Sequence, residues 1–534
     1  MLNTRLQRVA GSATAAALAL SMTAASAAPV KRVNPNHTVK PNTSGIITIP
    51  SEGGTLAALV YRGWMDYWGL AVPGDVQGAP GGQPLVAGVQ LIYGAVGTGS
   101  AQNDVANQES GWNDTTPSNP PNYNGSADYP GGLADTFLTT CNAQNNGSCG
   151  YQPTAGKALE TRDGTTSAGN SVTPDSIAFG GGDAPWDLAE LATYNNSSGT
   201  ASGYNLQRGP LIQVPLLATA VSIPFNPTNL TIPSGGVKLS RNSLCGIFTG
   251  NITNWNDPSI TSDNGGTTIG NQAITIVHRS DGSGTTFLTS YDLSVICAQS
   301  NVKTANAWNQ GVGTNSENGP LSGPPPNNTV VWPAASVAEK GSGGVASYIA
   351  GNAGAIGYLS PSYVGKAGGY EAFIQNTAGQ FVQATVSATQ AAIANGPFVI
   401  ASQTSEIPAG YPFIKNTYIP LPSNSAAAAL VGYTFGYFYP CSPKRQDDQI
   451  GKLKTFFAWA MTPEGNNGLT PADSIANANT LVWLPDTSPK SGGASKKTTL
   501  AAIKEMGVYP GSHSGTYTDP VTGATDSYTC TPLQ

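Results

Sequence analysis

The feature that most constrains the fold is a glycine-rich stretch at residues 278–286, His-Arg-Ser-Asp-Gly-Ser-Gly-Thr-Thr. Residues 273–277, just before it, alternate in polarity and are rich in β-branched side chains, which predicts a strand. Residues 287–296, just after it, carry apolar side chains at roughly helical spacing, which predicts a helix. The stretch is therefore expected to be a strand-to-helix turn.

This turn has the residue types of an anion site. Gly282 and Gly284 carry no Cβ, so the backbone can turn tightly and approach a ligand. Ser283 is a good N-cap, and the first amides of the helix, at Gly284 and Thr285, have no acceptor within the helix. With Arg279 close by, such a helix start suits a tetrahedral oxyanion. The alternative is a plain turn followed by a capped helix.

Two familiar motifs are excluded by the spacing. No Gly-Lys-Ser or Gly-Lys-Thr follows the glycines, so the stretch is not a Walker A loop. The order Asp-Gly-Ser-Gly also differs from the Gly-x-Ser-x-Gly of a nucleophile elbow. Nucleotide hydrolysis and hydrolase-type serine chemistry are therefore not indicated.

Two further segments repeat the strand, glycine turn and helix pattern. A strand predicted at 46–49 leads through a turn at 51–54 to Thr55, which is expected to cap a helix with an apolar face. A second strand, at 89–93, leads into Gly-Thr-Gly-Ser at 97–100. Alone, each turn is more simply structural. Together, three hydroxyl-bearing helix starts favour a shared site.

Several stretches resemble the phosphate-binding proteins of Pst-type ABC importers, the PstS-like periplasmic substrate-binding proteins, whose distant relatives include DING-type proteins. The most specific match is Arg-x-Asp-Gly-Ser-Gly-Thr at 279–285. Three stretches outside it match site regions or their surroundings in the family's order, and two match elsewhere. They are 54–64, 96–100 and 179–185, and then 248–257 and 354–358.

The resemblance implies a set of ligand residues: Thr55, the amide of Leu56, Thr98, Asp183, Arg279, Ser283, Gly284 and Thr285. It also implies that Asp281 holds Arg279 by an ion pair, with Gly282 beside it. Leu56 replaces a usual aromatic residue. Gly99 replaces a common serine, which leaves open whether Ser100 takes over its role. A solvent-facing Asp281 is the simpler alternative.

Asp183 bears most directly on specificity. A carboxylate beside a bound anion is repulsive unless the anion carries a proton for it to accept. Hydrogen phosphate carries one and sulfate at neutral pH does not, so a site built around this bond rejects sulfate. The alternative is that Asp183 only caps a turn before Pro185.

The family fold implied is α/β, the two-lobed type 2 periplasmic-binding fold, with two mixed-sheet Rossmann-like lobes joined by a two-segment hinge. Residues 45–215 and 356–534 are expected to form lobe 1, and 216–355 lobe 2. An insertion of about 101–175 and a long C-terminal extension depart from the family pattern.

The N-terminal residues predict export. Residues 1–28 combine Arg5 and Arg8 with an alanine- and leucine-rich run and a small-residue site near Ala27, as in a cleaved signal peptide. A polar, proline-bearing leader is expected at 29–44. No cysteine precedes Cys141, so a lipid anchor is not expected, and the product should be periplasmic or extracellular.

The charge pattern argues against two classes of partner. The formal net charge of −6 would become −8 without the two signal arginines, and only 10% of residues are charged. Nucleic acid and anionic membrane surfaces are therefore disfavoured. An anion site in this chain must act through local hydrogen bonds.

Six cysteines in an exported chain suggest disulfides, although six allow 15 connectivities. Pairing of neighbours is our guess: Cys141–Cys149, Cys245–Cys297 and Cys441–Cys530. A zinc cluster is the weaker alternative, since only three histidines are present and no Cys-x-x-Cys occurs. No metal or cofactor is expected.

The hypothesis is a monomeric, non-enzymatic binder of inorganic phosphate that delivers it to a membrane ABC permease without inserting into the membrane itself. A secreted phosphatase on the same fold is the rival, and a binder of another oxyanion is a third possibility. His278, next to Arg279, is the only obvious base near Ser283.

Overall fold

The computed structural model describes residues 47–71, 77–95, 97–107, 178–186, 211–316, 329–395, 421–439, 441–442, 447–463, 468–486, 495–504, 506–508, 514–518 and 525–529. The predicted signal peptide (1–28), the leader (29–44) and the insertion beyond residue 107 lie outside these ranges, as do Cys141, Cys149 and Cys530. None of the helices within these ranges has the length and apolar character that a membrane crossing needs.

The larger sheet is mixed and has the strand order β15-β4-β13-β3-β1-β2. Its strands are β1 (Ile47–Gly53), β2 (Val89–Ala95), β3 (Phe179–Gly182), β4 (Ile212–Ala220), β13 (Val431–Phe438) and β15 (Val482–Trp483). Strand β1 runs parallel to β2 and β3, while β13 runs antiparallel to β3 and β4. The carboxyl ends of β1, β2 and β3 therefore meet at one edge, which is where the glycine turns begin.

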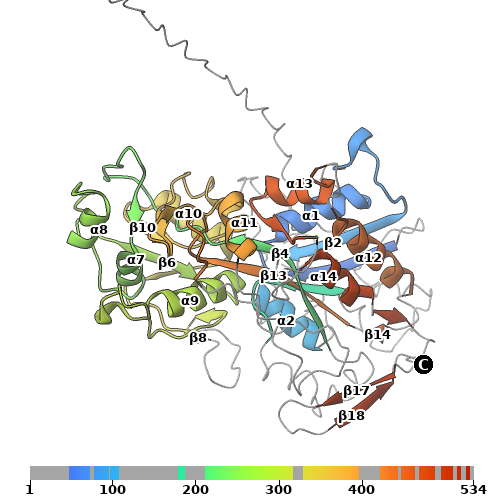
Figure 1. Cartoon of the computed structure of the whole chain (residues 1–534). Coiled ribbons are helices and arrows are strands. Elements are labelled where there is room, and N and C mark those ends of the chain that lie inside the picture. Colours follow the sequence, from blue (N-terminus) through green and yellow to red (C-terminus); the bar gives the residue numbers. More distant parts are fainter. Residues whose placement is uncertain are drawn as a thin grey trace, which may run out of the picture. The chain divides into compact units, whose positions relative to one another are not determined.

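Helices cover both faces of this sheet (Figure 1). One apolar cluster includes Trp64, Phe179 and Phe456 and joins the sheet to a first group of helices. A second cluster includes Val105, Ala392 and Tyr433 and joins the sheet to two others. The first group is α1 (Ala58–Trp68), α12 (Asp447–Ala460), α13 (Pro471–Ala478) and α14 (Lys496–Lys504), and the second is α2 (Thr98–Asn107) and α11 (Val386–Asn395).

A second, parallel sheet carries the 278–286 turn. It has the order β10-β6-β9, with β6 (Thr275–Arg279) in the centre, and its edge strands are β9 (Val337–Glu339) and β10 (Ala355–Gly357). The helices that accompany it are α7 (Arg241–Phe248), α8 (Pro258–Asp263), α9 (Gly284–Ile296) and α10 (Gly341–Gly351). The predicted α/β class with mixed sheets is confirmed.

Short strands complete the described residues. A small sheet has the order β12-β11-β5, and three two-stranded pairs join β7 with β8, β14 with β16, and β17 with β18. Their bounds are β5 (Lys238–Leu239), β7 (Asn315–Ser316), β8 (Thr329–Val330), β11 (Phe373–Gln375), β12 (Phe381–Val382), β14 (Cys441–Ser442), β16 (Gly507–Val508), β17 (Ser514–Thr518) and β18 (Thr525–Thr529).

Two local predictions around Thr55 are wrong. The expected turn at 51–54 is largely strand, because residues 51–53 pair with β2 on one side and β3 on the other. Helix α1 begins at Ala58, and its N-cap residue is Ala57, which makes no side-chain bond. Thr55 therefore does not cap the helix, and its hydroxyl is directed elsewhere.

The lobe boundaries at 215 and 356 stay a proposal. Strand β4 continues the first sheet to Ala220, and β11, at 373–375, pairs with β5. Under the two-lobe proposal, the chain would thus leave lobe 2 after β12 rather than at 356.

The predicted Cys245–Cys297 disulfide is present, with Cα atoms 5.7 Å apart. It links α7 to the C-cap residue of α9. The Cys141–Cys149 and Cys441–Cys530 pairs involve cysteines outside the described residues and stay predictions.

Candidate functional site

The ligand loop, which we define as residues 279–285, joins β6 to α9 as predicted. Strand β6 ends at Arg279, and α9 begins at Gly284. The Ser283 hydroxyl oxygen caps the helix by accepting a hydrogen bond from the Thr286 amide at 3.2 Å. Because a helix leaves its first amides without internal acceptors, Gly284 and Thr285 present N–H groups at this end.

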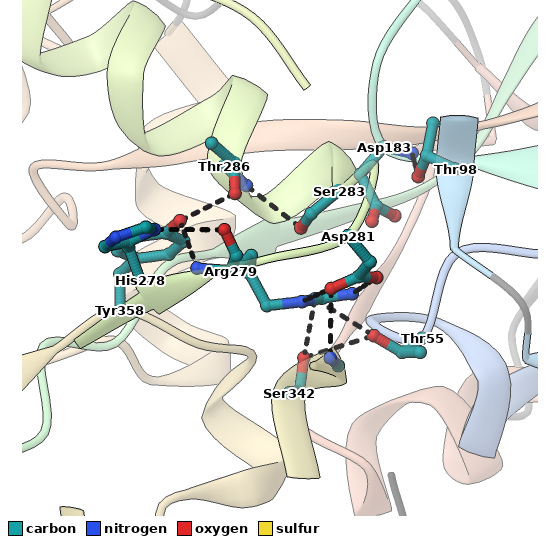
Figure 2. Close-up of polar contacts among 11 residues, drawn as sticks. Thr55, Thr98, Asp183, His278, Arg279, Asp281, Ser283, Thr286, Ser342 and Tyr358 are labelled. Carbon is teal, nitrogen blue, oxygen red and sulfur yellow. Dashed lines mark hydrogen bonds and ion pairs between the residues drawn. The ribbon is translucent and has the colours of Figure 1, made fainter. Parts of the chain in front are cut away.

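Three glycine-led segments meet here, although they are far apart in the sequence. The Gly99 amide donates to the Gly282 carbonyl at 3.2 Å, which joins the start of α2 to the ligand loop. A Cβ on Gly284 would lie 2.5 Å from Asp183 Cβ and 2.6 Å from Thr98 Oγ1. Only glycine permits this approach. Thr98, Asp183 and Ser283 are thus brought together, as the anion-site hypothesis requires (Figure 2).

Arg279 is the positive charge of the site. It is 2% exposed, and its guanidinium makes a two-point ion pair with Asp281, with Nε 2.6 Å from Oδ1 and Nη2 bonded to Oδ2. Its Nη1 donates to the Thr55 hydroxyl at 3.2 Å and to Ser342 Oγ at 3.4 Å (Figure 2). Burial acts to raise the pKa of Asp281, but attraction and hydrogen bonds from Arg279, the Gly341 amide and Lys340 outweigh it and lower that pKa.

Asp183 is a buried carboxylate with little compensation. It is 1% exposed, and its Oδ1 has no hydrogen-bond partner among the residues that the structure describes. Burial raises its pKa from 3.8 to about 7, and Arg279 only partly opposes this shift. The ionised form of this carboxyl group, which is present near neutral pH, can accept a hydrogen bond from a protonated ligand oxygen.

The hydroxyl groups around Asp183 keep their protons available. Thr98 Oγ1 accepts from the Asp183 amide at 3.2 Å, and Ser283 Oγ accepts from Thr286. Both oxygens are used as acceptors, so both protons can be donated to a ligand. Thr285 Oγ1 is buried and has no partner within the described ranges. These hydroxyl donors, together with the guanidinium of Arg279 and the carboxyl group of Asp183, suit a protonated tetrahedral anion.

Comparisons with known proteins show which family the chain belongs to. A family model described as a PBP superfamily domain matches residues 85–464. The phosphate-binding protein PstS of Xylella fastidiosa (strain Temecula1 / ATCC 700964) is 32% identical over 287 residues, which cover 52% of this chain and 72% of the relative. The chain belongs to the PstS-like phosphate-binding proteins. The predicted family and its two-lobed periplasmic-binding fold are therefore confirmed.

Two other similarities complete the comparison. Alkaline phosphatase L of Pseudomonas aeruginosa (strain PAO1) is 29% identical over 271 residues, which cover 50% of this chain and 62% of that protein. A solved structure of a high affinity periplasmic phosphate-binding protein (PfluDING) bound with phosphate has 23% identity and a TM-score of 0.48, and covers 86% of this chain and 99% of that one.

The other predicted residues of this PstS-like protein fall around the same point. Leu56 is fully buried in the turn before α1, and its carbonyl accepts from Ser360 Oγ at 3.5 Å. Gly282 supports the site through its carbonyl bond with Gly99. Ser100 lies in the first turn of α2, and its side chain is outside the described set. The ligand roles of all these residues stay predictions.

Aromatic rings back the ligand loop. The Tyr358 hydroxyl accepts from the Arg279 amide at 3.0 Å and lies 2.6 Å from Thr286 Oγ1. Trp332 stacks between Tyr358 and His278, with ring centroids 5.5 Å and 5.1 Å away. His278 Nδ1 contacts the Arg279 carbonyl at 3.0 Å, so His278 supports the loop backbone. Its ring points away from Ser283 (Figure 2).

One buried residue of the site, Ser342, was missed by the sequence analysis. Its oxygen lies 3.2 Å from Thr55 Oγ1, and it sits in the first turn of α10. A signal was available, since Gly-Ser-Gly-Gly at 341–344 follows strand β9 in the same strand, glycine and helix pattern.

The raised pKa of Asp183 gives a testable pH dependence of stability. The pKa is about 7 in the folded protein and near 3.8 in the unfolded chain, so the folded state binds the extra proton between these values. The free energy of unfolding of the ligand-free protein should fall as pH rises from about 4 to about 7, by roughly 4 kcal/mol at most. Asp183→Asn should remove this fall. Urea unfolding at a series of pH values measures this change, and the same dependence of the unfolding free energy on pH in both proteins would contradict the prediction.

Proposed function

We propose that the protein binds inorganic phosphate as hydrogen phosphate at this site. The observation that carries the proposal is the meeting of hydroxyl and amide donors from three chain segments around Arg279 and Asp183. The name of the PstS relative, a phosphate-binding protein, supports it. The proposed hydrogen-bond donors are the hydroxyl groups of Thr55, Thr98, Ser283 and Thr285 and the backbone amides of Leu56, Gly284 and Thr285.

The choice of hydrogen phosphate follows from Asp183. Stripping water from a phosphate is unfavourable by many kcal/mol unless its oxygens are hydrogen-bonded again, and the donors described above can do so. A fully ionised oxyanion would place two negative oxygens in contact at Asp183. A proton on the ligand oxygen turns that repulsion into a short, charge-assisted hydrogen bond.

Local donors must provide the affinity, because the net charge of the chain is −6 and repels anions at long range. The backbone and hydroxyl donors are held in place by helix starts and by close glycine contacts, so little ordering is needed on binding. Contacts from two sheets to one ligand would favour the closed arrangement of the lobes.

We further propose that the protein acts in phosphate import. The PstS-like family membership supports delivery to a membrane ABC permease, and residues 1–28 would export the chain to the periplasm or the cell exterior. A monomer that meets its permease transiently is the simplest form of this proposal.

Removal of Arg279 is the direct test of the site. Arg279→Ala should weaken phosphate binding by roughly 2–5 kcal/mol, as expected when one partner of a buried charge pair is lost. Isothermal calorimetry on phosphate-stripped protein measures this change. Arg241→Ala, at the start of α7, is the control and should bind as wild type. Near-wild-type affinity in Arg279→Ala would refute the role of Arg279.

Selectivity against sulfate is the test of Asp183. Millimolar sulfate should not displace phosphate from the wild-type protein at about pH 8, where Asp183, with a pKa of about 7, is ionised and sulfate has no proton for the carboxylate to accept. Asp183→Asn removes the repulsion, so sulfate should gain affinity by roughly tenfold or more. Competition calorimetry reports both values. Displacement of phosphate by sulfate from wild type would overturn this part of the proposal.

The phosphatase alternative remains open to a simple assay, and the similarity to alkaline phosphatase L is its support. We expect no turnover of a chromogenic phosphate ester, because the Ser283 oxygen is engaged as a helix cap and His278 bonds the loop backbone. Hydrolysis by wild type that disappears in Ser283→Ala would favour the phosphatase instead.

A further inference from the structure

Ser342 contacts residues that come from both sheets, namely Arg279 at the end of β6 and Thr55 after β1. It is fully buried, and helix α10 presents it to Arg279 from the edge of the second sheet. The Gly341 amide donates to Asp281 Oδ1 at 3.0 Å, which fixes the start of α10 against the Arg279–Asp281 pair. Thr55, its other neighbour, follows a strand of the first sheet.

Hydrogen-bond directions within this group can be worked out from the chemistry of the donors. A guanidinium only donates, so Arg279 Nη1 gives one hydrogen to Thr55 Oγ1 and one to Ser342 Oγ. Both hydroxyl oxygens therefore accept from Arg279. The bond between Thr55 and Ser342, at 3.2 Å, must use the proton of one of them and leaves the proton of the other free.

The surroundings decide which proton is used. The described residues offer the Ser342 hydroxyl no acceptor other than Thr55 Oγ1. Thr55, in contrast, is next to Gly54, where a Cβ would lie 2.9 Å from Thr98 Oγ1 and 3.0 Å from Asp183 Oδ2, so it adjoins the proposed phosphate site. If the Ser342 hydroxyl donates to Thr55 Oγ1, both hydroxyl protons have an acceptor, because the Thr55 hydroxyl can then donate its hydrogen bond to the anion. The reverse direction leaves a buried Ser342 proton unpaired and turns Thr55 away from the ligand, which is unfavourable.

We propose that Ser342 is a positioning residue that orients the Thr55 hydroxyl as a donor to the bound anion. Ser342 accepts a hydrogen bond from Arg279 and donates one to Thr55, so the positive charge of Arg279 polarises both hydroxyl groups in series. Such chains strengthen the terminal donor. This inference rests on the proposed phosphate site and adds a residue that does not itself touch the ligand.

The first measurement compares two buried serines by phosphate calorimetry. Ser342→Ala should bind phosphate about tenfold more weakly, which corresponds to about 1.4 kcal/mol. Ser243→Ala is the matched control, because Ser243 is also fully buried near the start of a helix and its oxygen lies 3.2 Å from another hydroxyl, Ser240 Oγ. The control should keep wild-type affinity. Equal affinity in Ser342→Ala and wild type would overturn the proposal.

The second measurement is a double-mutant cycle, which separates positioning of Thr55 from a general loss of packing. In a Thr55→Val background, Ser342→Ala should weaken binding by no more than about threefold, because the hydroxyl it orients is gone. The same tenfold loss in both backgrounds would show that Ser342 does not act through Thr55. Absence of phosphate binding by the wild-type protein would instead refute the proposed function, a distinguishable result.

Discussion

A buried guanidinium is the element on which the site depends. Arg279 is 2% exposed, and a buried cation is tolerated only when its hydrogen bonds and charge are compensated. Asp281 supplies the opposite charge, and Thr55 and Ser342 accept from the remaining nitrogen. Removing one partner of such a pair typically destabilises by about 3–5 kcal/mol. The position of Arg279 therefore ties together segments from both sheets.

The same burial that makes Arg279 demanding makes Asp183 useful. Both lie in a region of low effective dielectric, where attraction and desolvation are each larger than in water. Arg279 lowers the pKa of Asp183, but the loss of hydration outweighs it. The result is one permanently charged group paired with Asp281 and one carboxyl group that can exchange a proton near neutral pH. The carboxyl groups of Asp183 and Asp281 thus have different roles because their surroundings differ.

Local chemistry made the ligand loop predictable. The strand, glycine and helix pattern around 278–286 is found as expected, and Ser283 caps α9, because a serine at a helix start has few better partners than the N3 amide. Thr55 shows where this logic fails. A hydroxyl residue also precedes α1, yet Ala57 is the N-cap, and the threonine hydroxyl instead accepts a hydrogen bond from Arg279, 224 residues away.

Long-range pairing accounts for the other differences from expectation. Residues 51–53 resemble a turn when taken alone, but they are held extended by two neighbouring strands. The Gly-Ser-Gly-Gly run that contains Ser342 repeats the strand, glycine and helix pattern, but no arginine or aspartate beside it marks it as part of the site. Its contact with Arg279 depends on the way β9 and α10 pack beside the ligand loop. Contacts that depend on tertiary register cannot be read from local patterns.

The aromatic stack behind the loop gives this molecule an intrinsic optical reporter. The indole of Trp332 lies between two rings, and one of them, Tyr358, bonds both the Arg279 amide and Thr286. Any shift of the loop backbone or of the first turn of α9 changes what surrounds the indole. If phosphate binding shifts this backbone, the emission of Trp332, one of nine tryptophans in the chain, should change without an attached dye.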